Sequence, residues 1–154
     1  MAQAISRPSA VTGRAIRDRT ELIDVATALV RAVSRPATRE GEWLADVHKS
    51  VLRVQDELDA QRAMTRRPGG QYAEILELDP RLGPTVARLV AEQDELVDTV
   101  ARIVRAIERA EPNSAAIGPV RERVRRMSRV LVRHAHRSDD LLYEAYDVDL
   151  GGEA

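Results

Sequence analysis

The sequence predicts an all-α protein, an up-down-up-down bundle of four helices. Over most of the chain, apolar residues recur at alternating spacings of three and four, which is the period of a helix face packed on other helices. The segments between these stretches are short and contain Pro, Gly, Asn and Ser, which interrupt helices. Ala, Val, Leu and Arg dominate the composition and Phe is absent, which favours helices packed through aliphatic side chains.

The first helix is predicted over residues 14–33 and ends before Pro36. Residues 1–13 are small and polar and are expected to be disordered. Residues 14–150 are then expected to form a single domain, long enough to bury a core. The first-helix residues expected to face that core are Ile16, Ile23, Ala26, Val30 and Val33.

The second helix is predicted over residues 40–64 and is ended by Pro68, Gly69 and Gly70. Its apolar face stops at Gln61, where the spacing places an amide on the core side. Residues 72–78 are expected to form a short helical turn before Pro80. The apolar residues expected on the core face of the second helix are Leu44, Val47, Val51, Val54 and Leu58.

Two long helices follow, over residues 82–110 and 117–146, and each carries a polar residue on its core face. Gln93 interrupts the face of the third helix, and His134 interrupts that of the fourth. The other expected core residues are Leu82, Val86, Leu89, Leu96, Val100, Ile103 and Ile107 in the third helix, and Ile117, Val120, Val124, Met127, Leu131, Ser138 and Leu141 in the fourth.

Gln61, Gln93 and His134 are expected to form one polar layer inside the bundle. The turn between the last two helices is centred near Asn113, and Gln93 and His134 lie about 20 residues before and after it, so an antiparallel pair places them at one level. The layer member from the first helix falls within residues 14–20 and is not fixed by spacing. Such a layer either fixes helix register through hydrogen bonds or holds a ligand.

Three segments of the chain resemble hemerythrin-like (HHE) domains. The segments at residues 71–82 and 89–96 resemble the middle of that family, in which Glu-His stands in the place of Glu92-Gln93. The segment that begins at His134 resembles the family's closing His, which an acidic residue follows four or five positions later. The resemblance implies a hemerythrin-like bundle in which His and carboxylate side chains from all four helices bind a di-iron centre or another metal.

Most ligands that the resemblance implies are missing from this sequence. Gln61 stands in the place of a family His, and Thr65 or Arg66 stands in the place of the carboxylate that follows it. Gln93 replaces another His, and the first helix contains none. Only His134, with Asp139, matches the family pattern. Because a carboxamide binds metals weakly, no cofactor is expected; the alternative is a reduced site for iron, another divalent metal or a small ligand near His134.

Composition and motifs also limit the classes of function. Without Cys the chain has no disulfide, thiolate ligand or thiol nucleophile, and neither a nucleophile motif nor a phosphate-binding glycine loop is present. An enzyme is therefore not expected. The formal net charge is −1, no apolar run approaches the roughly 20 residues of a membrane span, and no hydrophobic signal segment is present. A cytoplasmic structural or interaction protein, with an unknown protein partner, is the leading hypothesis.

Two surface features leave alternatives open. The last helix carries a row of arginines spaced by four, which either contacts phosphates or pairs with acids of the third helix such as Glu92 and Glu95. No aromatic residues interleave with that row, so pairing or solvation is favoured over nucleic-acid binding. The row consists of Arg121, Arg125, Arg129, Arg133 and Arg137. Leu141, Leu142, Tyr143 and Tyr146 are expected either to cover the open end of the bundle or to form a partner surface.

Overall fold

The computed structural model describes the backbone of residues 10–151 and the side chains of residues 20–146. Within this range the chain is all-α, as predicted, and contains no strand. Its elements are α1 (Ala10–Ser34), α2 (Glu40–Arg66), α3 (Gln71–Leu78), the 3-10 turn η1 (Pro80–Leu82), α4 (Gly83–Arg109) and α5 (Ser114–Gly151). Helix α1 begins ahead of the expected start at Arg14. Residues 1–9 of the segment expected to be disordered lie outside the described residues.

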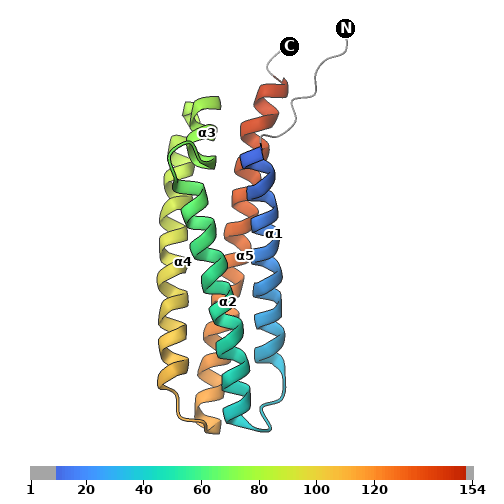
Figure 1. Cartoon of the computed structure of the whole chain (residues 1–154), viewed down its shortest axis with the longest axis vertical. Coiled ribbons are helices and arrows are strands. Elements are labelled where there is room, and N and C mark those ends of the chain that lie inside the picture. The colour runs from blue at the N-terminus through green and yellow to red at the C-terminus, as the bar shows by residue number, and fades with distance from the viewer. Residues whose placement is uncertain (1–9, 152–154) are drawn as a thin grey trace.

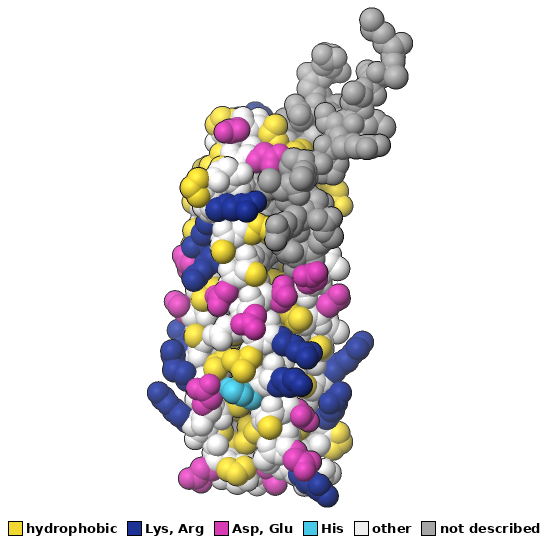
Figure 2. Space-filling model, in the orientation of Figure 1, with side chains coloured by type: hydrophobic (Ala, Val, Ile, Leu, Met, Phe, Trp, Pro, Cys, Tyr) yellow, Lys and Arg dark blue, Asp and Glu magenta, His cyan; other side chains and the backbone are white. Residues whose placement is uncertain are grey.

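The long helices α1, α2, α4 and α5 lie side by side, and the chain reverses direction from each one to the next (Figure 1). Helix α1 packs against α2 and α5, and α4 packs against the same two helices. The short helix α3 and the turn η1 connect α2 to α4 at one end of the molecule (Figure 1). None of the described helices is long and apolar enough to span a bilayer. Figure 2 shows acidic and basic side chains interspersed on one face, with apolar side chains between them.

The described core divides into two apolar clusters. The larger one, here the main cluster, takes residues from α1, α2, α4 and α5, from Leu22 to Leu131 in chain order. The smaller one, here the end cluster, consists of Tyr72, Ile75, Leu82, Val86, Leu89, Leu141, Leu142 and Ala145. On α4 the main cluster begins at Leu96 and the end cluster stops at Leu89. Gln93, between Leu89 and Leu96, and His134, between Leu131 and Leu141, lie in the interval between the two clusters.

The apolar faces predicted for the last three long helices are confirmed. Every residue expected on the core face of α2, α4 and α5 is buried, including the polar ones. The face predicted for α1 is partly wrong, because Leu22 and Leu29 are buried where Ile23 and Val30 were expected, and these two are half-buried. Leu22, Ala26, Leu29 and Val33 are spaced by four, three and four, which is an equally regular face. Ile16 lies outside the described side chains.

The turn that ends α2 depends on two glycines. Gly69 has a φ of +71°, a left-handed conformation that glycine adopts without steric cost. Gly70 is buried, and a Cβ atom there would lie 2.7 Å from the Met64 carbonyl oxygen and 2.8 Å from that of Arg67. This tight reversal ends α2 at Arg66 and leads into α3 at one end of the molecule (Figure 1).

Asp79 fixes the start of η1. Its Oδ1 atom accepts a hydrogen bond from the backbone N–H of Arg81 at 3.1 Å, which caps the turn. The Arg81 side chain also donates to the Asp79 carboxylate, and this hydrogen bond lowers the pKa of Asp79 below its ordinary value. The connection that leads into α4 is therefore held by its own side chains.

The residues near the end of α5 divide between packing and exposure. Leu141 and Leu142 belong to the end cluster, and the Tyr146 hydroxyl donates to Glu74 Oε1 of α3 at 3.0 Å. Tyr143, in contrast, is 70% exposed. Leu141, Leu142 and Tyr146 therefore contact other parts of the molecule, as the packing alternative expected.

The Arg121 side chain of α5 caps the carboxyl end of α1. Its Nε donates to the Val33 carbonyl oxygen and its Nη2 to that of Arg35, each at 2.7 Å. Its guanidinium also lies 5.4 Å from the centre of the Trp43 ring, within cation–π range. The last carbonyl groups of a helix lack intrahelical partners, so a cation there both satisfies them and complements the helix dipole.

We expect Arg121→Ala to lower the free energy of unfolding by about 2 kcal/mol, because it removes two charge-assisted hydrogen bonds and a cation–π contact. Urea unfolding followed by circular dichroism measures the change. Arg125→Ala is the matched control, since Arg125 is exposed one turn later on the same helix. Similar losses in the two variants would contradict a capping role for Arg121.

Candidate functional site

The three polar residues predicted from the sequence are all buried between the two apolar clusters. Gln93 of α4 is completely buried, Gln61 of α2 is 3% exposed, and His134 of α5 is 2% exposed. On each helix the residue follows or precedes members of the main cluster at regular helical spacing. Thr65, Gln71 and Ser138 are also buried polar residues in this part of the chain. The candidate site is this polar layer.

Gln93 is bound by two residues from the end of α2. The Arg66 Nε donates to Gln93 Oε1 at 3.0 Å, and Gln93 Nε2 donates to Thr65 Oγ1 at 3.5 Å. The same guanidinium donates to the Val90 carbonyl oxygen at 2.8 Å and lies 2.8 Å from Asp94 Oδ1. A half-buried arginine thus reaches from α2 across to α4 and fixes the amide orientation of Gln93.

His134 is bound by a neighbour of Gln93. Its Nδ1 lies 3.1 Å from Glu92 Oε2, and because a carboxylate only accepts, the ring nitrogen is the donor. Arg137, one turn further along α5, donates to the other oxygen of Glu92. Ser138 donates to the His134 carbonyl oxygen at 3.0 Å. Glu92 therefore links α4 to α5 through both the His134 imidazole and the Arg137 guanidinium.

None of these hydrogen bonds joins two of the three predicted residues directly. Gln93 and His134 are each bound by a neighbour from another helix, and the Oε1 atom of Gln61 has no hydrogen-bond partner within the described part of the chain. A buried amide oxygen without a partner costs on the order of 1–3 kcal/mol. The layer is thus composed of two hydrogen-bonded groups, one around Gln93 and one around His134, with Gln61 beside them.

The other candidate residues lie apart from this layer. His136 is exposed, as expected for a residue two positions from a buried one on a helix. His48 is half-buried on α2, with its Nε2 3.2 Å from Glu108 Oε1. Asp139 is half-buried on α5. Among the described side chains, no group of three or more His, Asp or Glu is placed to hold a metal ion.

The arginine row of α5 does not act as one unit. Arg121 binds the end of α1, and Arg137 binds Glu92 as the pairing alternative expected. Arg125, Arg129 and Arg133 are exposed. The two ends of the row, Arg121 and Arg137, therefore make contacts within the molecule, whereas the three arginines between them are exposed to solvent.

Arg66, Glu92 and Arg137 are site residues that the core-facing pattern alone did not select. Each is half-buried or exposed and lies beside the core face rather than on it, so apolar spacing gives no signal for it. The available signal is sequence proximity, because Glu92 precedes Gln93 and Arg137 follows His134 by three positions, close to one helical turn.

Comparison of the chain with protein-family models, with curated proteins and with solved structures gave no match.

Proposed function

We propose that this chain is a hemerythrin-like up-down-up-down four-helix bundle that works as a non-catalytic structural or interaction protein without a di-iron site. The observation that carries this proposal is the 3.0 Å hydrogen bond from Arg66 Nε to Gln93 Oε1. Gln93 occupies the position at which the resemblance implies a metal ligand. A guanidinium at that distance places a permanent positive charge where a metal cation would have to bind, and the two charges repel.

The chemistry of the neighbouring donors supports the same proposal. A carboxamide oxygen is a weak ligand for iron or zinc compared with imidazole or carboxylate. The Glu92 carboxylate already accepts hydrogen bonds from His134 and Arg137 on its two oxygens. These side chains fit a hydrogen-bonded layer that sets the register between α2, α4 and α5, and they fit a di-iron centre poorly.

One observation favours the alternative, a reduced metal or small-ligand site with His134 and Asp139 as first ligands. Histidine ligands of metals commonly donate their other ring N–H to a carboxylate, and His134 Nδ1 has this relation to Glu92. The alternative predicts that uptake of a divalent metal is stoichiometric and is abolished in His134→Ala.

Replacing the layer by apolar side chains tests the leading proposal. In Gln61→Leu/Gln93→Leu/His134→Leu we expect the helical content to be kept and the melting temperature to be unchanged or higher. Leucine avoids the cavities that alanine would leave, and the substitutions remove the buried Gln61 Oε1, which has no partner within the described chain. The groups that lose a partner keep other contacts: Arg66 with Asp94, Thr65 with the Arg62 carbonyl oxygen, and Glu92 with Arg137. Circular dichroism and differential scanning calorimetry provide the measurement. A triple variant that does not fold would contradict the proposal.

A further inference from the structure

The solvent-facing side of α5 carries charges that are segregated along the helix. From residue 123 to residue 137 the exposed residues with a full charge at pH 7 are all arginines, and beyond them the exposed charges are acidic. A helix turns by about 100° per residue, so side chains within about 100° of one another share its outer face. Those that share it are Arg125, Arg126, Arg129 and Arg133, here the basic block, and Asp140 and Glu144, here the acidic block.

Most of the basic block has no acidic partner within the described part of the chain. Arg125, Arg129 and Arg133 are exposed, and none of them forms an ion pair or a hydrogen bond with a described side chain. Arg126 has a contact of 3.4 Å with the exposed Glu122, a type of pair that stabilises little. The block therefore keeps an excess of positive charge at the surface.

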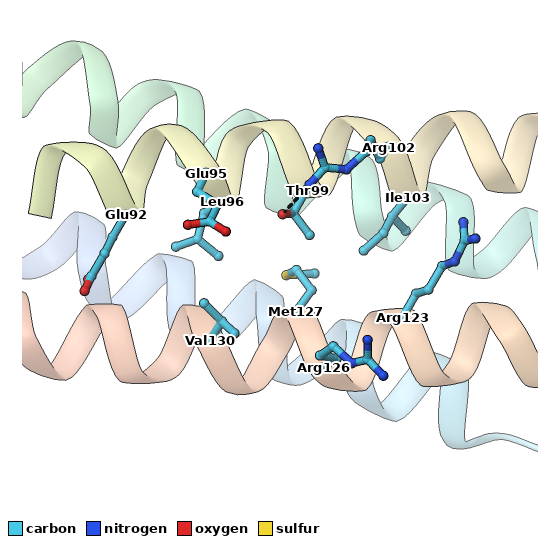
Figure 3. Close-up of a pocket in the computed structure, with 10 residues that line it drawn as sticks. All are labelled: Glu92, Glu95, Leu96, Thr99, Arg102, Ile103, Arg123, Arg126, Met127 and Val130. Atoms are coloured by element: carbon cyan, nitrogen blue, oxygen red, sulfur yellow. Dashed lines mark hydrogen bonds between the residues drawn. The ribbon is translucent and has the colours of Figure 1, made fainter. Parts of the chain in front are cut away.

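Figure 3 shows the edge of the basic block that lies next to α4. A pocket between α4 and α5 is lined there by residues of both helices, Arg126 and Glu95 among them. The Arg126 side chain lies along α5, away from Glu95, whereas the Arg123 side chain extends toward α4 (Figure 3). At this edge the basic block is thus directed to solvent rather than to an acid of the neighbouring helix.

The acidic block also lacks an ion pair. A pocket at this place contains Arg88 and Arg137 as well as the two acids. Neither Asp140 nor Glu144 forms an ion pair with them or with another described residue. Tyr143 lies between the two acids and is 70% exposed. This end of the face therefore combines uncompensated negative charge with an uncovered aromatic ring.

We propose that a second copy of this chain binds this face, through an antiparallel contact between two α5 helices related by a twofold axis. The basic block of each copy then lies opposite the acidic block of the other, and the same contact is made twice. Arg133 lies three positions before His136, and Asp140 lies four after it. Arg129 lies seven positions before His136, and Glu144 lies eight after it. Both pairs of charges therefore align across one axis that passes beside His136.

The order of the charges favours a second copy over another partner. A nucleic acid or an anionic membrane would be attracted to the basic block but repelled by the acidic block, about two turns further along the same face. A partner that satisfies both blocks carries the reverse order of charges, which an antiparallel copy has by symmetry. Tyr143 would lie level with Arg129 of the second copy, where an aromatic ring can pack against a guanidinium. Tyrosine and arginine are also enriched in protein interfaces.

A contact of this kind predicts weak association. The face from Arg125 to Glu144 is about 28 Å long. Exposed ion pairs each contribute little, so the Kd of the dimer is expected to be on the order of 10–100 μM. This inference goes beyond the proposed function, because it names a partner for a surface separate from the polar layer.

Analytical ultracentrifugation of the full chain, from about 5 μM to about 1 mM, tests the proposal. We expect a monomer–dimer equilibrium at about 0.05 M NaCl, and about tenfold or weaker association at about 0.5 M NaCl. Arg129→Glu/Arg133→Glu and Asp140→Arg/Glu144→Arg are each expected to weaken self-association by about tenfold or more, because each makes the two blocks alike in charge. All four positions are exposed, so both variants are expected to fold.

An equimolar mixture of the two variants is expected to form a heterodimer, because the reversed blocks complement each other at both contacts. Its Kd is expected to lie within about threefold of that of the unchanged protein. Lys49→Glu/Arg53→Glu is the matched control, since it makes the same change in charge as the arginine variant, at the same spacing, on exposed positions of α2. Helix α2 lies across the bundle from α5, so the control is expected to change the Kd by less than about threefold.

A chain that stays monomeric over this concentration range, whether or not it binds duplex DNA or anionic vesicles, would overturn the proposal. So would self-association that salt does not weaken, an equal loss in the control, or a mixture of the two variants that does not associate. The metal content of the polar layer does not enter these measurements, so either proposal can fail without the other.

Discussion

Gln93→Ala is expected to lower the free energy of unfolding by about 3 kcal/mol. Gln93 is completely buried, and its Oε1 accepts a hydrogen bond from Arg66 while its Nε2 donates to Thr65. Truncation leaves a cavity between α2 and α4, and it also removes the acceptor of a half-buried guanidinium nitrogen and the donor to a buried hydroxyl. Cavity formation and loss of buried hydrogen bonds both destabilise, and together they reach this magnitude.

Urea unfolding at 25 °C, followed by circular dichroism at 222 nm, measures the effect. Gln55→Ala is the matched control, because Gln55 is half-buried on α2 and lies outside the polar layer. The control is expected to change the free energy of unfolding by less than about 0.5 kcal/mol. If Gln93→Ala were as stable as the control, Gln93 would not be a structural member of the layer.

His134→Ala is expected to destabilise the protein by a similar amount, about 3 kcal/mol. The imidazole is 2% exposed, and its removal leaves a cavity beside the end of the main cluster. It also removes the donor that holds Glu92 Oε2, so that the carboxylate keeps only its contact with Arg137. The linkage between α4 and α5 at this level then depends on a partly exposed ion pair.

His136→Ala is the control for this variant, since His136 is exposed two positions further along α5. Its melting temperature is expected to stay within about 2 °C of the unchanged protein, whereas that of His134→Ala falls by roughly 6–12 °C. Differential scanning calorimetry measures the melting temperatures of the two variants. Equal melting temperatures would contradict a packed, hydrogen-bonded role for His134.

Every residue that the sequence predicted on the core faces of α2, α4 and α5 is buried, although Trp43, Val104 and Ala135 are buried as well and were not predicted. The faces of α2, α4 and α5 alternate strictly between spacings of three and four, so only one register buries them. Helix α1 is different because it has apolar residues at both Leu22 and Ile23 and at both Leu29 and Val30. Two faces are then equally regular, and contacts with α2 and α5 decide between them.

The same contrast applies to the candidate site. Burial of Gln61, Gln93 and His134 follows from their position on the core faces, so the sequence predicted it. Their hydrogen-bond partners depend on how long side chains such as those of Arg66 and Glu92 cross between helices, and periodicity carries no information on that. The same limit explains why the arginine row was treated as a single surface, although Arg121 contacts the end of α1 and Arg137 contacts α4.

The central claim is that the polar layer is a structural element and not a metal centre. Elemental analysis of the untagged protein, purified without chelators, followed by titration with iron, manganese and zinc, tests it most directly. We expect a folded protein that contains no stoichiometric metal and takes up none on titration, because the Arg66 guanidinium beside Gln93 repels cations and carboxamides bind metals weakly. Near-stoichiometric metal that is lost in His134→Ala, and retained in His136→Ala, would contradict the claim.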